Sequence, residues 1–433
     1  MRITQLRFGG FKSLRDVTCH LDQLTVITGP NGAGKSNLVD AINLLSECFQ
    51  YDLEIAVARA GGYTNIAYRG VDLGSQQITC VVSLEFNGNE SRLRSRLRSH
   101  RSGAEVDSAP FVMFYRFSLE ADEAEGSEFS VTEEYIELRD QGGLVLKVER
   151  NQSNLKFWRA KRMKSRRSLY GDLLYPLSED AFIEFAKQRV ESTSLVMLSL
   201  QFGGGGIFEL IRRQLGDARV FQLSPNQVRQ AGVSTPNARL DRHGENLPAV
   251  ADFLRKNKRD SWAKIEAAMQ TILPQLESID TTFTTDRRLA LQFKERDLDR
   301  PWNSNEMSDG TVQTLALFVA LFDTRSPVLI VEEPENALHP WILRHFLSEC
   351  REQSDKQIVL TTHSPVLLDL MSPENIRLIW SKGGESHLAH INELNPSVVD
   401  MWKSGDLRTF EIYDSVIVSE YLPEIYLSES ECK

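Results

Sequence analysis

This 433-residue sequence contains no long apolar segment and few cysteines. Its longest uninterrupted apolar run, Leu315–Phe322, is far too short to cross a bilayer. The N-terminus carries Arg2 and Arg7 but no apolar signal-peptide core. The five cysteines are scattered without a CxxC pair, which argues against a zinc site and against a disulfide framework. These absences predict a cytoplasmic protein with free thiols and no membrane segment.

The sequence also lacks internal repeats and a sustained heptad pattern, so it does not predict a long coiled coil. It has no excess of positive charge, since the net charge is −10, and this value alone argues against nucleic acid as a partner. The basic residues are nevertheless clustered. Five of the ten residues 92–101 are arginine, and seven of the twelve residues 156–167 are lysine or arginine.

The second basic cluster contains an aromatic side chain. A basic stripe with an aromatic suits contact with a phosphate backbone and stacking on the bases of DNA or RNA. Charge runs are, however, usually solvated loops, and we weigh the two interpretations equally. The candidate nucleic-acid residues are Lys156, Trp158, Arg159, Lys161, Arg162, Lys164, Arg166 and Arg167.

The segment Gly29–Ser36 fits the phosphate-loop pattern G-x-x-x-x-G-K-[ST] without a mismatch. The apolar run Leu24–Ile27 predicts a strand before it, and apolar residues at helical spacing from Leu38 to Phe49 predict a helix after it. Backbone N–H groups at such a helix N-terminus cradle phosphates. Lys35 is expected to reach the β- and γ-phosphates, and Ser36 to bind Mg²⁺. The predicted ATP-binding residues are Gly29, Pro30, Asn31, Gly32, Ala33, Gly34, Lys35, Ser36 and Asn37.

A second strand is predicted to supply the acidic residues that a phosphate loop needs. The apolar run Pro327–Val331 is followed directly by Glu332 and Glu333, so both carboxylates emerge at the C-terminal edge of a buried strand. We expect Glu332 to hold Mg²⁺, directly or through water, and Glu333 to orient the attacking water. Glu332 lies 296 residues beyond Ser36, from position 36 to position 332. A large insertion therefore splits the nucleotide-binding fold.

Two further motifs flank this acidic strand. Met307–Thr311 precedes an apolar helix, Val312–Phe322, and a Ser and a Gly at a helix N-terminus predict a second anion site. After the acidic strand, the buried run Ile358–Thr362 ends in His363, whose imidazole can hydrogen-bond a γ-phosphate. Taken alone, a His after a strand is more often a satisfied loop residue.

In this order the motifs resemble those of the ABC-type ATPases, specifically the soluble branch of the SMC, RecF and overcoming-lysogenisation-defect (OLD) proteins. The closest resemblance is to stand-alone predicted ATPases of bacterial defence loci, and it covers nearly the whole chain. The matching segments are the first hairpin Phe11–Leu14, Walker A at Gly29–Ser36, the middle segment Leu240–Leu254 with Gly244-Glu-Asn-Leu247, the signature Ser308–Thr311, Walker B and the D-loop at Val331–Asn336, and the switch His363. The signature has Asp309 where transporters have Gly, and Glu332 stands in the usual Asp position.

The resemblance implies a mechanism in which two subunits sandwich two ATP molecules, with Mg²⁺, in a homodimer or a higher even oligomer. The signature of one subunit would cap the γ-phosphate held by the Walker A loop of the other. The resemblance also implies a glutamine that senses Mg²⁺, for which Gln201 is our candidate; a polar residue before a Gly-rich loop is the equally weighted alternative. The implied roles are catalytic for Lys35, Glu333 and His363, a D-loop role for Asn336, and capping in trans for Ser308, Asp309, Gly310 and Thr311.

The sequence departs from two members of this branch. SMC proteins carry long heptad segments, and OLD nucleases carry a C-terminal TOPRIM domain, whereas here only 70 residues follow His363, up to position 433. We therefore expect no nuclease activity in this chain and a separate effector protein, a nuclease or a toxin, as a partner. The apolar tail Phe410–Leu427, with Tyr413, Tyr421 and Tyr426, either docks that partner or packs against the ATPase lobe.

The predicted fold is α/β, an ABC-type P-loop ATPase fold split by a large, mostly helical insertion. We expect an N-terminal ATPase half at residues 1–90, an insertion at 91–280, a C-terminal ATPase half at 281–395 and a tail at 396–433. The predicted function is an ATPase that dimerises on ATP and couples this to nucleic-acid sensing or effector control, in bacterial defence or DNA maintenance. The alternative is a nucleotide-gated scaffold that sequesters a toxic effector with little turnover.

Overall fold

The structure is a computed structural model that describes residues 1–70, 77–86, 110–121, 128–160, 184, 190–199, 206–394, 398–405 and 408–420. The chain forms two compact units. Unit 1 comprises Met1–Asp22, Asn31–Asp217 and Ile379–Ala389, and unit 2 comprises Gln23–Pro30, Ala218–Leu378 and His390–Lys433. The chain therefore passes between the units several times, first after Asp22 and then after Pro30, inside the predicted phosphate loop.

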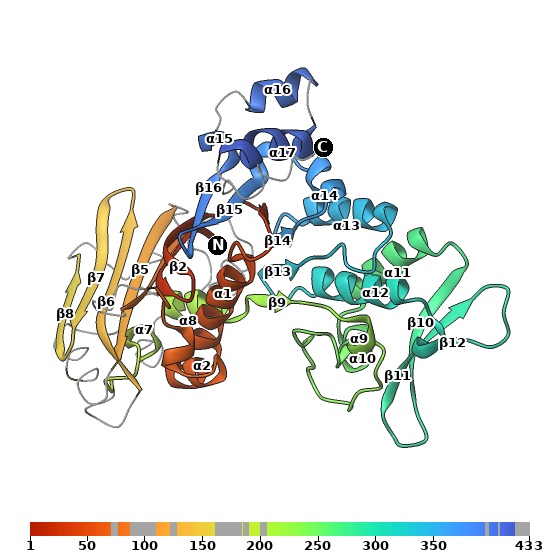
Figure 1. The fold of residues 1–433 in the computed structure, drawn as a ribbon. Helices are drawn as coiled ribbons and strands as arrows, with labels where there is room; N and C mark the ends of the chain where they lie inside the picture. The colour runs from red at the N-terminus through yellow and green to blue at the C-terminus, as the bar shows by residue number, and fades with distance from the viewer. Residues whose placement is uncertain are drawn as a thin grey trace. The chain divides into compact units, whose positions relative to one another are not determined.

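Unit 1 contains a seven-stranded antiparallel sheet (Figure 1). In spatial order its strands are β2 (Leu14–His20), β1 (Arg2–Phe11), β4 (Ile78–Phe86), β5 (Phe111–Ala121), β6 (Phe129–Asp140), β7 (Gly143–Asn151) and β8 (Asn154–Arg159). In β5 the side chains of Phe111, Met113, Tyr115 and Phe117 are buried, and the positions between them are more exposed. This alternation is typical of a sheet with one face on a core. Strands from both sides of residue 90 pair within this one sheet.

Among the described residues of unit 1 the longest helix is α1 (Lys35–Gln50), which follows the predicted phosphate loop. Its apolar stripe is buried, as the sequence spacing predicts. α1 packs against α8 (Gly206–Gly216) so closely that a Cβ atom at Gly216 would lie 2.9 Å from the carbonyl carbon of Phe49. The other described helices of this unit include α2 (Leu53–Arg59), α3 (Tyr63–Ile66) and α7 (Val196–Ser199).

A second sheet has six strands. In spatial order they are β16 (Glu385–His390), β15 (Ile376–Lys382), β3 (Leu24–Thr28), β14 (Gln357–Thr362), β13 (Val328–Glu332) and β9 (Arg219–Phe221). The neighbours from β15 to β9 pair in parallel. Every residue of β3, β13 and β14 is buried, as expected for a parallel sheet covered on both faces. Because these strands are parallel, their C-terminal ends meet at one edge, where Gly29, His363 and Glu333 begin the following segments.

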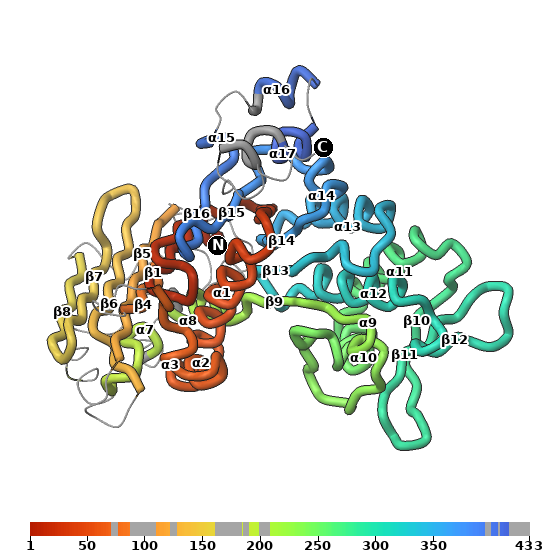
Figure 2. The backbone as a smooth tube through the Cα atoms, viewed as in Figure 1, coloured from red at the N-terminus to blue at the C-terminus, as the bar shows by residue number. Residues whose placement is uncertain are grey.

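Unit 2 also holds the most buried helix, α12 (Asp309–Phe322), in which every residue from Thr311 to Phe322 is buried. A three-stranded sheet of β10 (Leu276–Phe283), β11 (Leu289–Glu295) and β12 (Trp302–Asn303) belongs to the same unit (Figure 2). The other described helices of unit 2 are α9 (Pro225–Val228), α10 (Leu247–Asn257), α11 (Arg259–Ile272), α13 (Pro340–Glu352), α14 (Pro365–Asp369), α15 (Ile391–Leu394), α16 (Val398–Ser404) and α17 (Thr409–Glu420), with 3₁₀ helices η3 (Ser304–Glu306) and η4 (Pro373–Asn375).

The predicted α/β fold is confirmed. The strands expected around residues 24–27, 327–331 and 358–362 are β3, β13 and β14. Strand β9 lies in the insertion at 91–280, which the sequence predicts as mostly helical. It was missed because three residues are too few to show a strand alternation.

The expectations on membranes and thiols can be compared with the described residues. Cys19, Cys48, Cys80 and Cys350 are buried free thiols, as predicted. Within the described parts of the chain, no helix combines the length and apolarity needed to cross a membrane.

The described part of the tail packs against unit 2 itself. The Thr409 hydroxyl donates a hydrogen bond to the carbonyl of Met371 over 2.8 Å, and the Phe410 N–H donates to the Asp369 carboxylate over 3.0 Å. Ile412 is completely buried. For these residues the contacts favour packing against the ATPase lobe over docking of a partner. Tyr421 and Tyr426 lie outside the described residues.

Candidate functional site

The predicted phosphate loop connects β3 to α1, and its last glycine is the N-cap of the helix. Gly34 has a φ of 105°, in the left-handed region that favours glycine, and within the described residues no side chain caps α1. The start of α1 is a helix end at which the dipole favours an anion. Lys35 is only 8% exposed, whereas Ser36 faces solvent.

Two serines for which the sequence predicted no individual role support this loop within unit 1. The Ser386 hydroxyl donates a hydrogen bond to the carbonyl of Ala33 over 2.8 Å and lies 2.7 Å from the Ser13 hydroxyl. The Asn37 amide donates to the same Ser13 hydroxyl over 2.6 Å. A Cβ atom at Gly34 would lie 2.1 Å from Ser386 Oγ, so only glycine fits at this position.

A cavity of about 660 Å³ lies beside this loop in unit 1. Asn37 contributes to its wall together with three cationic side chains, Lys12, Arg15 and Arg69. Its volume is typical of small-molecule sites, and cationic side chains bind phosphate groups through charge-assisted hydrogen bonds. Lys12 pairs with Asp40 over 2.7 Å and Arg15 pairs with Glu385 over 2.7 Å, so the charge of two of these three cations is compensated within the protein.

The two predicted acidic residues occupy the C-terminal end of β13 in unit 2. Glu332 is the last residue of the strand and is 6% exposed. Its Oε1 accepts a hydrogen bond from Nη2 of Arg242 over 2.8 Å. Glu333 follows with a φ of 46°, in the left-handed region that is unfavourable for a residue with a Cβ atom. Backbone strain of this kind concentrates at functional sites, and here it falls on the predicted catalytic carboxylate.

The structure brings three predicted site residues of unit 2 together. Nδ1 of His363 lies 3.4 Å from a carboxylate oxygen of Glu333 and 3.7 Å from one of Glu335. The Asn336 amide donates a hydrogen bond to the other Glu333 oxygen over 3.1 Å. The Thr362 hydroxyl donates to Glu335 over 2.7 Å, which orders the turn before the His. The predicted catalytic base, switch His and D-loop Asn are therefore direct neighbours.

The predicted metal ligands have the right chemistry for Mg²⁺. Glu332 offers a carboxylate and Ser36 a hydroxyl, the oxygen ligands that Mg²⁺ prefers in phosphate-loop proteins. Among the described residues there is no group of three or more His, Cys, Asp or Glu side chains placed to hold a metal ion. A Mg²⁺ that binds together with a nucleotide needs no such group, because phosphates and water supply most of its ligands.

The predicted signature motif begins α12. Ser308 is the N-cap, and its hydroxyl accepts a hydrogen bond from the Thr311 N–H over 3.2 Å. Ser308 and Asp309 are both exposed. Asp309, the residue that departs from the transporter pattern, forms an ion pair with Arg229. A Cβ atom at Gly310 would lie 3.0 Å from the Ala337 carbonyl, so the signature packs closely on the D-loop of its own chain.

The predicted Mg²⁺-sensing glutamine, Gln201, lies outside the described residues. Another glutamine, Gln222, directly follows β9 and is exposed at the edge of the parallel sheet where the other strands end. β9 pairs with β13, so Gln222 follows the strand next to the one that carries Glu332. One signal that could have indicated this residue is the short apolar pair Val220-Phe221 before it.

The predicted nucleic-acid cluster is described only in part. Lys156, Trp158 and Arg159 lie on the last strand of the unit 1 sheet, and Trp158 is 45% exposed. Lys156 pairs across the strands with Glu149, and Trp158 with Lys147. The two cross-strand neighbours, Glu149 and Lys147, carry opposite charges. The other five residues of the cluster lie outside the described residues, so nucleic-acid binding by this cluster stays a prediction.

Comparison with known proteins identifies relatives along most of the chain. A family model described as "AAA domain, putative AbiEii toxin, Type IV TA system" matches residues 24–369. The OLD nuclease of Thermus scotoductus (strain ATCC 700910 / SA-01) is 23% identical over 417 residues, which are 92% of this chain and 66% of that protein. The chromosome partition protein Smc of Bordetella petrii (strain ATCC BAA-461 / DSM 12804 / CCUG 43448) is 34% identical over 95 residues, 21% of this chain and 8% of that protein.

Solved structures of SMC heads also align with the chain. An SMC head bound to the C-terminal winged-helix domain of ScpA aligns with a TM-score of 0.49 and 14% identity, over 90% of this chain and 98% of that one. The SMC head of Thermotoga maritima aligns with a TM-score of 0.38 and 14% identity, over 90% and 99%. The chain thus spans just under two thirds of the OLD nuclease, and a small part of Smc.

The matched family region runs from the first residue of β3 to the end of α14. It therefore includes the phosphate loop, the signature, the acidic strand and the switch His. The predicted membership of the RecF, SMC and OLD branch of ABC-type ATPases is confirmed. Because the family model covers well over half of its residues, the chain belongs to the family described as "AAA domain, putative AbiEii toxin, Type IV TA system".

Proposed function

We propose that this chain is a Mg²⁺-dependent ATPase that dimerises on binding ATP. The observation that carries the proposal is the contact of His363 with the strained, hydrogen-bonded Glu333 at the C-terminal end of the parallel sheet. A carboxylate fixed next to an imidazole can orient a water molecule and accept its proton. Phosphoryl transfer depends mainly on this kind of positioning and on charge stabilisation.

Each of the other site residues has a role in this proposal. The N–H groups at the start of α1 and the Lys35 ammonium bind the phosphates, and Ser36 and Glu332 hold Mg²⁺. When bound, Mg²⁺ neutralises the charge that develops on the transferred phosphoryl group. Gln222 is our candidate for the glutamine that contacts the metal site, beside the earlier candidate Gln201.

The exposed signature supports assembly in pairs. Ser308 and Asp309 face solvent at the N-terminus of a buried helix, an arrangement that suits an anion on another subunit. We propose that this signature caps the ATP bound by a second copy of the chain. Closure of the dimer would then be the conformational change that acts on a nucleic acid or on a separate effector.

The direct test measures phosphate release and oligomer size with the purified chain, with and without ATP and Mg²⁺. The proposal expects ATP hydrolysis and an ATP-dependent dimer. A dimer that forms with ATP but hydrolyses none would favour the alternative, a nucleotide-gated scaffold. No nucleotide binding under any condition would contradict both.

The biological setting is also a proposal. The family description names a putative toxin of a type IV toxin–antitoxin system, which supports a role in bacterial defence or growth control. We propose that a separate nuclease or toxin is the effector. The test is the purified chain with supercoiled DNA, linear DNA and RNA; cleavage abolished by a Glu332→Gln change would place nuclease activity in this chain instead.

A further inference from the structure

Arg242 contacts the buried carboxylate that is expected to bind Mg²⁺. Its Nη2 atom lies 2.8 Å from Oε1 of Glu332, a residue 90 positions away in the sequence. The Glu332 side chain is 5% exposed and that of Arg242 is 33% exposed. A carboxylate this deeply buried is stable as an anion only when it is paired. Arg242 therefore compensates the charge of Glu332.

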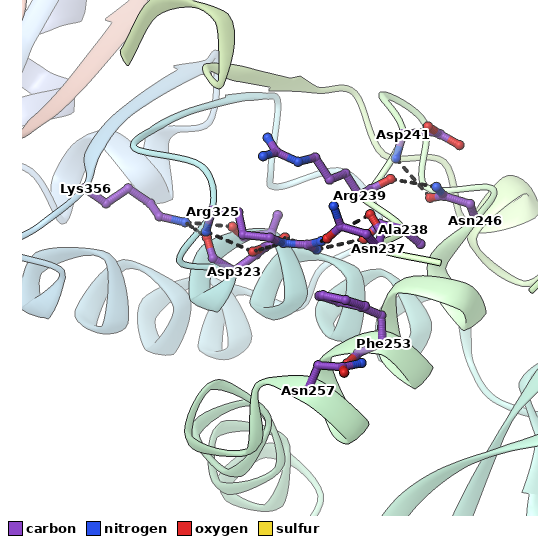
Figure 3. A network of polar contacts seen from close by, with 11 residues as sticks. Asn237, Ala238, Arg239, Asp241, Asn246, Phe253, Asn257, Asp323, Arg325 and Lys356 are labelled. Carbon is purple, nitrogen blue, oxygen red and sulfur yellow. Dashed lines mark hydrogen bonds and ion pairs between the residues drawn. The ribbon is translucent and has the colours of Figure 1, made fainter. Parts of the chain in front are cut away.

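The loop that carries Arg242 is built around one asparagine. The Asn246 side chain accepts a hydrogen bond from the Asp241 N–H over 3.0 Å and donates one to the Arg239 carbonyl over 2.7 Å (Figure 3). These two bonds tie the backbone before Arg242, at Arg239 and Asp241, to the side chain of Asn246 after it. Asn246 belongs to the segment Gly244-Glu-Asn-Leu247, which the sequence singled out without assigning a role.

The same loop is attached to the residues that follow β9. The Gln222 N–H donates to the Arg242 carbonyl over 2.9 Å, and the Ser224 N–H donates to the His243 carbonyl over 3.3 Å. Gly244 has a φ of 84°, and a Cβ atom there would lie 2.7 Å from a methyl carbon of Val228. The glycine therefore lets the loop approach the segment after β9, next to the strand that ends in Glu332.

A buried polar network fixes the start of the loop. The Arg325 guanidinium donates hydrogen bonds to the Asn237 side chain over 2.9 Å and to the Ala238 carbonyl over 2.7 Å (Figure 3). Arg325 is itself held by Asp323 over 2.6 Å and lies over the ring of Phe253. The loop is thus anchored at its start, its middle and its end, so the position of Arg242 is set by the fold.

This placement has an electrostatic consequence. Any Mg²⁺ bound by Glu332 would share the carboxylate with a guanidinium, and two cations repel each other strongly where water is largely excluded. The binding of Mg²⁺ and the contact of Arg242 with Glu332 therefore oppose each other.

We propose that Arg242 is a resident counter-cation of Glu332 that competes with Mg²⁺, so that the loop at residues 237–247 sets how much Mg²⁺ the nucleotide site requires. This inference rests on the proposed function. Arg242 acts through Glu332 and is thus a positioning residue, which holds the carboxylate in place until Mg²⁺ enters with ATP.

The test compares Arg242→Gln with the parent in a Glu333→Gln background, where hydrolysis does not interfere. A fluorescent ATP analogue is titrated in EDTA and at increasing Mg²⁺. We expect the Mg²⁺ concentration for half-maximal nucleotide binding to fall about tenfold or more, because a charged hydrogen bond no longer competes for Glu332. Affinity for the analogue in EDTA should stay unchanged.

Two further variants protect this test against a folding artefact. Arg242→Lys keeps a positive charge without the planar fork and should shift the Mg²⁺ dependence in the same direction by a smaller factor. Arg255→Gln is the matched control, because Arg255 is 34% exposed and pairs with Asp280 over 2.7 Å in the same unit. It should leave the Mg²⁺ dependence unchanged.

The outcomes separate the inference from the proposed function. Nucleotide binding with an unchanged or increased Mg²⁺ requirement in Arg242→Gln and Arg242→Lys would overturn the competition and leave the ATPase proposal standing. Failure of the parent and of every variant to bind the analogue at any Mg²⁺ concentration would overturn the proposed function and this inference with it.

Discussion

The imidazole Nδ1 of His363 lies 3.4 Å from the carboxylate of Glu333, and Asn336 donates a hydrogen bond to the same carboxylate over 3.1 Å. Two residues from two different turns thus converge on one carboxylate. This convergence gives the predicted catalytic base a fixed orientation, which a solvated acidic turn would lack. It leads to the first prediction.

Glu333→Gln should lower the rate of ATP hydrolysis by about 10² to 10⁴-fold, because an amide accepts no proton from water. Nucleotide binding should persist, so the ATP-bound dimer should accumulate. Phosphate release and light scattering after size exclusion measure the two effects. An unchanged rate of hydrolysis would remove Glu333 from the catalytic role.

Mixing two inactive variants should restore hydrolysis. Lys35→Ala removes a phosphate ligand and Ser308→Arg blocks the exposed signature, so each variant alone should be inactive. A mixed dimer combines one intact Walker A loop with one intact signature and should give about a quarter of the wild-type rate after random mixing. If each variant alone keeps its activity, or if mixing restores none, the signature does not act in trans.

Asp323→Asn should cost about 3 kcal/mol of unfolding free energy, because it removes the charge partner of Arg325 in a site where both side chains are nearly buried. The measurement is urea unfolding at neutral pH. Asp16→Asn is the control, since the ion pair of Asp16 with Arg7 is exposed on both sides and should contribute less than about 1 kcal/mol.

The same Asp323→Asn change predicts a pH dependence. Burial opposes the ionisation of Asp323, but hydrogen bonds and charge from Arg325 outweigh it and hold the pKa below its ordinary value of 3.8. A carboxyl with a lowered folded pKa stabilises the protein above its unfolded pKa and loses this contribution as pH falls through the folded value. The stability difference between wild type and variant should therefore be constant near neutral pH and shrink only below about pH 4.

Gly244→Ala should destabilise the Arg242 loop. The alanine would add left-handed strain of about 1 kcal/mol and a clash with the Val228 side chain, where its Cβ would lie only 2.7 Å away. Gly384→Ala is the matched control, because Gly384 has a φ of 82° but nothing within 4 Å of a Cβ atom. In thermal unfolding the melting temperature should fall further for Gly244→Ala than for Gly384→Ala. Equal decreases would mean that the close approach to Val228 does not affect stability.

Several elements were predictable because their signals are local. Strand β3, the phosphate loop and α1 follow from a short apolar run, a fixed loop pattern and helical spacing, all within 27 residues from Leu24 to Gln50. The acidic strand β13 is likewise an uninterrupted apolar run. Strand β9 was not predictable, because its three residues become a strand only through pairing with β13.

The candidate site residues likewise divide into those that the sequence indicates and those that only the structure identifies. The candidates Lys35, Ser36, Glu332, Glu333 and His363 could be selected from the sequence, since each stands at the end of a recognisable strand or loop. The serines that support the loop, Ser13 and Ser386, could not, because a lone serine carries no local signal. Their contact with each other joins residues 373 positions apart.

By itself the sequence determined which chemical groups this protein has at its nucleotide site and in what order, because strand and helix periods and the phosphate-loop pattern are local properties of the chain. Only the tertiary structure decided which groups meet. Arg242 reaches Glu332 across 90 residues and Arg229 reaches Asp309 across 80, through contacts that depend on how loops lie along a folded sheet. A charge needs a partner only when folding buries it. The partner of Glu332 could therefore be identified only from the folded structure.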